Sequence, residues 1–235
     1  MNDLPEVRTA PVGEDRLGRV LRWVILGGWV LWAALAWWST PRQVDQGQLD
    51  RDLAADRVVT WQRADGWGDG TWEFRGRHPE PAPAEYGQML VWTVPTGQTR
   101  YVEAIVDADA VPADRYAERL AATALPWRAD RVLAHRVADS AGLLGVLTGL
   151  LWLTMLVAGP PPRRGTRWYW FWLGLLPYGV GMLAWLYQEK WRPPVDRANR
   201  HTGWLGVAWG IAFGFVIGAA VVGARYLLGG SVVPG

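Results

Sequence analysis

Four long apolar stretches dominate the pattern of hydrophobic and polar positions along the chain. They cover residues 23–39, 140–159, 168–187 and 203–223, and none contains Asp, Glu, Lys, Arg or His. A helix rises about 1.5 Å per residue, so about 17–25 apolar residues cross the roughly 30 Å hydrocarbon core of a bilayer. Buried helices of soluble proteins are usually shorter and keep a polar face. The pattern therefore predicts four transmembrane helices.

The first stretch, 23–39, has a second interpretation as the apolar region of a signal peptide. Ala34 and Ala36 are spaced like the small residues of a cleavage site. However, a long segment precedes the stretch, and its apolar run exceeds the usual length of about 7–15 residues. We expect it to remain a membrane helix, with cleavage as the alternative.

The third stretch, 168–187, contains Pro177 at its centre between several glycines. Proline is tolerated in transmembrane helices, so a kinked spanning helix is the expectation. The alternative is a re-entrant hairpin that turns near Pro177 and is covered by neighbouring helices. Such a hairpin would place the loops 160–167 and 188–202 on one side of the membrane and the C-terminal tail, 224–235, on the other.

The segment between the first two stretches, residues 40–139, has the composition of a globular protein and is long enough for a domain. β-Branched and aromatic runs predict strands, and amphipathic spacing predicts helices. In chain order the elements are a helix at 46–55, strands at 57–63, 71–75, 88–94 and 99–106, and helices at 112–123 and 127–139. The predicted fold is a membrane all-α bundle of four transmembrane helices with an inserted small α+β extracytoplasmic domain of about four antiparallel strands plus helices.

Charge predicts the orientation of these parts. The N-terminal segment, 1–22, carries four Arg and the loop 160–167 carries three, whereas residues 40–139 contain 12 Arg and 16 acidic residues. Basic flanks stay in the cytoplasm. The N-terminus is therefore expected inside and residues 40–139 outside. The basic loop 188–202 disagrees, because four spans would also place it outside.

Tryptophan is unusually frequent, with 18 residues. The indole ring is apolar with one N–H donor, which suits the boundary between hydrocarbon and headgroups. We predict membrane-interface anchors at the six Trp residues that lie at or near segment ends: Trp23, Trp37, Trp38, Trp168, Trp191 and Trp204.

Glycines recur at intervals of four residues in two of the stretches. Small residues at this spacing let helix backbones approach closely in lipid. The predicted helix-packing positions are Gly206, Gly210, Gly214 and Gly218, with Gly145 and Gly149 in the second stretch. Packing within one bundle is the expectation, and homo-oligomerisation through the same face is the alternative.

Composition excludes several functions. The chain has no Cys, which excludes disulfides, thiolate metal sites and Cys nucleophiles. The apolar stretches carry no ionisable residue, which disfavours ion transport. The only sizeable soluble block is acidic, which disfavours nucleic-acid binding.

The run Asp65–Gly70 has features of a calcium loop, with an acid at the fifth position and Gly at the sixth. However, Trp67 occupies the third position, and Gly76 occupies the twelfth, where a bidentate Glu is needed. A hairpin turn explains the whole run.

The other candidate chemistry is scattered. One group, Asp107, Asp109 and Asp114, fits a strand end and a charged helix start. A second group, His78, Glu80 and Glu85, fits a solvated Pro-rich loop. Ser140, with His135 and Asp139 nearby, lacks a nucleophile elbow, and His201 is isolated. We therefore predict no catalytic, cofactor or metal site.

Three motifs carry a resemblance: Trp38-Ser39-Thr40-Pro41 after the first stretch, the strand that starts at Arg57-Val58-Val59, and the run from Thr166 to Leu173. With Arg almost replacing Lys, they look like uncharacterised multi-pass membrane proteins of high-GC Gram-positive bacteria. The resemblance covers most of the chain and implies a bacterial plasma membrane location and no known activity. A fainter similarity of residues 40–63 to the ectodomain of membrane-anchored AAA proteases transfers no function, because the ATPase and protease motifs are missing.

The functional expectation follows from a folded ectodomain without a recognisable site. We expect a non-enzymatic integral membrane protein whose residues 40–139 bind a protein or cell-envelope partner. The alternatives are a membrane enzyme acting on a lipid or envelope substrate, and an accessory subunit of a transporter or secretion complex.

Overall fold

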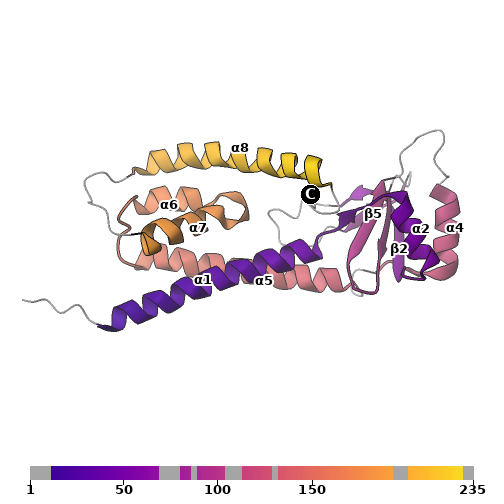
Figure 1. The fold of residues 1–235 in the computed structure, drawn as a ribbon, viewed down its shortest axis with the longest axis horizontal. Helices are drawn as coiled ribbons and strands as arrows, with labels where there is room; N and C mark the ends of the chain where they lie inside the picture. Colours follow the sequence, from indigo (N-terminus) through magenta and orange to yellow (C-terminus); the bar gives the residue numbers. More distant parts are fainter. Residues whose placement is uncertain are drawn as a thin grey trace, which may run out of the picture.

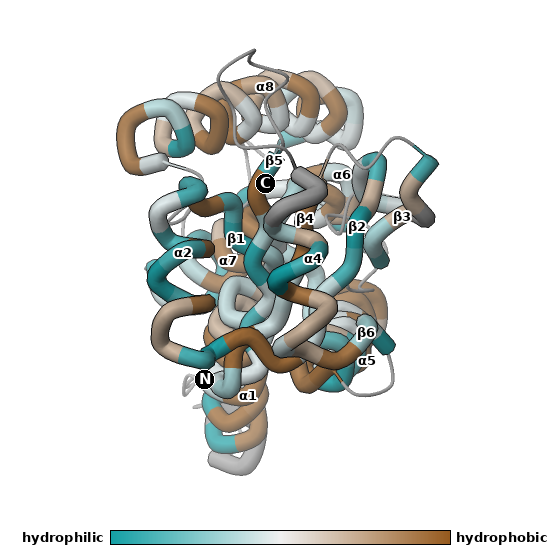
Figure 2. The backbone as a smooth tube through the Cα atoms, turned by 90° about the vertical axis from the view of Figure 1, so that its right-hand side faces the viewer, coloured by the Kyte–Doolittle hydropathy of each residue, from teal (hydrophilic) through white to brown (hydrophobic). Residues whose placement is uncertain are grey.

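A computed structural model describes residues 12–68, 80–85, 89–103, 113–128, 132–192 and 201–229 of the 235-residue chain. Figure 1 shows an elongated molecule with two parts. The helices α1, α5, α6, α7 and α8 lie at one end, and a sheet with α2 and α4 lies at the other. In Figure 2 hydrophilic positions are plain on α2, β2 and β3, and hydrophobic positions are plain on α8.

Three helices are long and apolar enough to cross a membrane: α1 (Val12–Ser39), α5 (Leu133–Ala158) and α8 (Gly203–Leu228). Each extends beyond its predicted apolar stretch at one end, by residues 12–22 in α1, 133–139 in α5 and 224–228 in α8. Large apolar side chains on their surfaces, such as Leu143 and Phe215, are exposed. These features fit a membrane protein.

The fourth predicted span is not found. Residues 168–187 do not form one helix but a hairpin of α6 (Arg167–Gly174), a single turn η2 (Pro177–Gly179), α7 (Val180–Trp185) and the π-helical η3 (Leu186–Trp191). Three helices long enough to span are therefore described and a fourth is not, and the chain reverses near Pro177, as in the shape of the hairpin alternative.

Backbone geometry explains why the chain reverses here. Tyr178 and Gly179 both adopt left-handed conformations, with φ of 59° and 67°. After the turn α7 packs directly on α6. The two backbones are so close that a Cβ on Gly181 would lie 1.6 Å from the carbonyl oxygen of Leu173. Only glycine permits this approach.

The hairpin is covered by the surrounding helices. The largest fully buried side chains of the bundle core come from α1, α5, α6 and η3: Ile25, Leu156, Trp170 and Leu186. The ring of Trp152 on α5 fills the space beside Gly174, where a Cβ would lie 2.0 Å from it. Coverage by protein is what non-spanning backbone requires at membrane depth.

The two ends of α8 show its direction. At its start, His201 pairs with the loop before α6, because Thr166 donates its N–H to the His201 carbonyl at 3.0 Å. At its end, Arg225 donates to the Gln43 side chain at 3.3 Å, beside the sheet. The helix α8 therefore runs parallel to α1, as Figure 1 shows.

The sheet is mixed and has the order β1-β5-β4-β2-β3, with β6 pairing β2. The pairs β2–β3, β2–β4 and β4–β5 are antiparallel, whereas β1–β5 and β2–β6 are parallel. The strands are β1 (Arg42–Gln43), β2 (Thr60–Trp67), β3 (Pro81–Pro83), β4 (Met89–Thr93), β5 (Thr99–Glu103) and β6 (Leu125–Pro126).

Three of the predicted strands correspond to β2, β4 and β5. The predicted strand at 71–75 lies outside the described residues. The prediction of an antiparallel sheet is corrected to a mixed one, because the two-residue strands β1 and β6 pair in parallel. Both are too short to produce a hydrophobic pattern.

The sheet has an apolar core on each face. On one face α2 (Gln46–Ala54) and α4 (Ala113–Thr123) bury Leu49 and Leu120 against Trp92. The opposite face carries a smaller cluster of alternate residues: Ala64, Met89, Val91 and Tyr101, with Trp67 and Trp127 packed against it.

Candidate functional site

A buried carboxylate organises the sheet domain. Asp52 on α2 is fully buried and accepts hydrogen bonds from the Trp92 indole at 3.1 Å and the Gln48 amide at 3.0 Å. It also pairs with Arg57 at 3.0 Å and with Arg100. The network ties α2 to β4 and β5.

Two opposing effects set the charge state of Asp52. Burial would raise the pKa of its carboxyl, but hydrogen bonds from Arg100 and Trp92 favour the charged form and lower the pKa below its ordinary value of 3.8. All the donors around the carboxylate come from the chain itself. We therefore assign Asp52 a structural role.

The opposite face of the sheet meets the end of α8. Tyr101 packs edge-on against Trp67, with ring centroids 5.1 Å apart. Burial is the main cause that raises the pKa of the Tyr101 phenol, and the nearby Arg225 lowers it in part. The contact of Arg225 with both Tyr101 and Gln43 joins α8 to the edge of the sheet formed by β1 and β5.

The link from α1 to the sheet is short and buried. Ser39 and Thr40 both donate hydroxyl hydrogen bonds to the Ala36 carbonyl, at 3.1 and 2.7 Å, and both are buried. Two residues later β1 begins, and Val44 donates its N–H to the Tyr101 carbonyl at 3.0 Å. Little freedom remains between the helix and the sheet.

The link to α5 is equally close. A Cβ on Gly97, in the hairpin between β4 and β5, would lie 2.7 Å from Leu133. At the same helix start His135 lies 3.9 Å from Glu80 and packs against Trp127 with ring centroids 5.9 Å apart. The sheet domain is thus attached to all three long helices.

Ser140, His201 and Asp65, three candidates from the sequence, have the following contacts. The Ser140 hydroxyl donates to the Arg136 carbonyl of its own helix at 2.8 Å. His201, predicted to be isolated, stacks on Tyr169 with ring centroids 5.1 Å apart. In the calcium-like run, Asp65 accepts a hydrogen bond from the Glu85 backbone N–H.

Several candidate ligands cannot be placed. His78, Asp69, Asp107 and Asp109 lie outside the described residues, and the side chain of Asp114 is not described. Within the described part of the chain, no three His, Asp or Glu residues are placed to hold a metal ion.

The predicted interface Trp residues occupy both ends of the helices. Trp37 is about half exposed and contacts Arg42, whose guanidinium carbon lies 4.5 Å from the ring centroid. Trp38 is partly buried. The other four are exposed and lie at the end of the molecule away from the sheet: Trp23, Trp168, Trp191 and Trp204.

The predicted packing glycines divide into two groups. Gly206 faces the backbone of Tyr169, where a Cβ would lie 2.6 Å from the carbonyl oxygen, and Gly210 faces Trp172 of the same helix α6. Gly145 faces Trp32 of α1, where a Cβ would lie 2.9 Å from the indole nitrogen. The other positions have no neighbouring atom within 4 Å of a Cβ: Gly149, Gly214 and Gly218.

The Asp52 network is not among the sites predicted from the sequence. Trp92 and Arg100 lie 40 and 48 residues after Asp52, so no local motif connects them. Comparisons of the chain with protein-family models, with curated proteins and with solved structures gave no match.

Proposed function

We propose that the chain is an integral protein of the bacterial plasma membrane whose residues 40–139 bind a protein or cell-envelope partner outside the cell. The observation that carries the proposal is the attachment of the sheet domain to three apolar helices, through Thr40, Gly97 and Arg225. A domain held in one orientation presents a preorganised surface, which lowers the entropic cost of binding.

The hairpin supports the proposed orientation. Because α6 and α7 form a hairpin, Gly165 and His201 pair at the same end as Arg22 of α1, which donates to the Lys190 carbonyl. All the basic flanks then share one side, which the positive-inside rule assigns to the cytoplasm. The sheet domain and the end of α8 lie on the opposite side.

An apolar spot on the sheet is our choice for the contact surface. Val59 and Leu125 are 43% and 54% exposed, and they are neighbours because Leu125 donates its N–H to the Val59 carbonyl at 3.1 Å. Both lie where β6 joins β2. Burial of exposed apolar surface is the dominant favourable term in most protein–protein association.

Site-specific photocrosslinking in intact cells tests this function. A crosslinking amino acid at Leu125 should give a discrete adduct, whereas the same group at Ala122, exposed on α4, serves as the matched control. The proposal fails if neither position captures a partner and a chain without residues 40–139 corrects the phenotypes of the null strain as well as the full chain does.

A further inference from the structure

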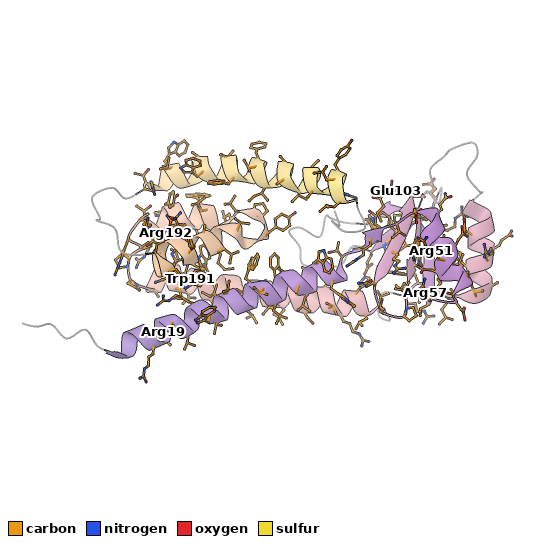
Figure 3. The ribbon with its side chains drawn as sticks, viewed as in Figure 1. Arg19, Arg51, Arg57, Glu103, Trp191 and Arg192 are labelled. Atoms are coloured by element: carbon orange, nitrogen blue, oxygen red, sulfur yellow. The ribbon has the colours of Figure 1, made fainter. Side chains whose placement is uncertain are left out.

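Basic side chains converge at the end of the helices away from the sheet. Arg22 of α1 donates through Nη1 to the carbonyl oxygen of Lys190 at 2.8 Å. The rings of their neighbours, Trp23 and Trp191, lie 6.1 Å apart. Figure 3 shows Trp191 and Arg192 at this end, with Arg19 nearby on α1.

The carboxylate beside these cations is already engaged. Glu189 accepts the backbone N–H groups of Arg163 and Arg164 at 2.6 and 2.9 Å and the indole N–H of Trp170 at 2.8 Å. These bonds bring the loop before α6 against the end of η3. Glu189 therefore holds the backbone of the cluster together.

The cations are close enough to repel one another. Burial is the main cause that lowers the pKa of the Lys190 ammonium, and repulsion from Arg22 and Arg163 lowers it further, while Glu189 opposes them. The Lys190 ammonium lies 5.1 Å from the centre of the Trp185 ring, and three positive charges gather beside the single negative charge of Glu189 in this partly buried place. The arrangement is complementary to a group of negative charge, and Arg192 adds a further exposed cation beside it.

The surroundings of the cluster are those of a membrane interface. Trp23 and Trp191 are 61% and 45% exposed, and Trp168 and Trp204 are exposed at the same end of the molecule. Tryptophan is enriched at the level of the lipid headgroups. A ligand here would have its anionic group at the cations and apolar chains along α1.

We propose that Arg22, Arg163 and Lys190 bind the phosphate of an anionic phospholipid in the leaflet at this end of the bundle. Basic pockets beside transmembrane helices recognise lipid headgroups by this charge complementarity. The Trp23 and Trp191 rings would contact the glycerol and upper acyl region. The inference requires insertion in a membrane and is independent of the partner proposed for the sheet domain.

The test variant is Arg163→Gln/Lys190→Gln. It removes two charges but keeps the backbone N–H that Glu189 accepts and the carbonyl to which Arg22 donates. The matched control is Arg16→Gln/Arg167→Gln, which removes two charges from the same end. Arg16 lies about 9 Å before Arg22 along the helix axis.

Binding of phosphatidylglycerol to the purified full-length protein, measured by native mass spectrometry in detergent, gives the readout. The Arg163→Gln/Lys190→Gln variant should bind phosphatidylglycerol at least about tenfold more weakly than the wild type. The affinity of the control variant should differ from that of the wild type by no more than about twofold. Phosphatidylcholine should bind as weakly to the wild type as phosphatidylglycerol binds to the Arg163→Gln/Lys190→Gln variant. Arg163→Lys, which keeps the charge, should retain binding and shows that the loop tolerates substitution.

Three results would overturn the proposal. Equal losses in both double variants would indicate diffuse attraction to the basic end. Equal binding of both lipids would remove the role of charge. Inorganic phosphate that competes with phosphatidylglycerol at equal concentration would assign the cluster to a soluble anion.

Discussion

The Trp29 indole on α1 donates a hydrogen bond to the carbonyl oxygen of Tyr178 at 2.7 Å, at the tip of the helical hairpin. At the turn the backbone does not continue the helical hydrogen-bonding pattern. A buried carbonyl that lacks a hydrogen-bond donor is costly in an apolar environment. The Trp29 ring also lies against Gly179, 3.0 Å from where a Cβ would be. The Trp29 side chain thus supplies the hydrogen-bond donor for the Tyr178 carbonyl and also covers the turn.

Trp29→Phe should therefore loosen the hairpin. It keeps most of the apolar area but removes the donor, so we expect a loss of about 1–3 kcal/mol. Thermal unfolding of the purified protein measures the effect. Trp204→Phe, at a position that is 80% exposed, is the control and should change stability little. Equal stability of the two variants would contradict a structural role for this bond.

The sequence predicts the three long helices because lipid demands uninterrupted apolar length, which composition records directly. It does not decide between a kink and a hairpin at 168–187, since Pro177 fits both. The deciding features are the left-handed backbone at Tyr178 and the approach of Gly181 to Leu173. A left-handed Tyr has no sequence signature, because non-glycine residues rarely adopt this conformation.

The sheet domain also has one part that the sequence predicts and another part that it does not. Local alternation predicts β4 and β5, whose turn chemistry is also local. The Asp52 network depends on residues far apart in the chain, and burial of an acidic residue contradicts the usual expectation for its type. Long-range pairing of polar groups is therefore the part that the pattern could not supply.

Asp52→Asn should destabilise the sheet domain. The substitution keeps the shape but removes the charged acceptor of the Trp92, Arg57 and Arg100 side chains, and because both arginines are partly exposed we expect a loss of about 1–3 kcal/mol. Chemical denaturation followed by tryptophan fluorescence measures it. Asp50→Asn, on the exposed side of α2, is the control and should cost less than about 1 kcal/mol.

The same carboxylate should give the wild type an acid sensitivity that the Asn variant lacks. Because the folded pKa lies below the ordinary value of 3.8, the unfolded chain binds the proton more tightly. The stabilisation by Asp52 is present above that value and is lost as the pH falls through the lowered folded pKa. A difference between wild type and variant that stays constant from pH 6 down to pH 2 would contradict this assignment.

Cysteine labelling should report the side of each end, and the chain has no native Cys to interfere. With the hairpin, Ala84→Cys and Tyr226→Cys should react with an impermeant maleimide in intact cells, and Arg192→Cys should react only after permeabilisation. Four spans would reverse the last two results. All three positions are exposed, and Tyr226 lies in the last turn of α8, beyond the predicted apolar stretch 203–223.

The glycine face of α8 should respond differently along its length. Gly206→Leu places a side chain against the Tyr169 backbone, so it should destabilise the folded chain. A Cβ on Gly214 or Gly218 would have no atom of the described chain within 4 Å, so Gly214→Leu/Gly218→Leu should leave the monomer folded. Native mass in detergent then decides how the open half is used. If the double variant lowers the mass of the assembly to that of a monomer, copies of the chain pack through this half, because small residues permit close helix contact in lipid. An unchanged mass with a folded chain assigns the face to lipid and removes the oligomer.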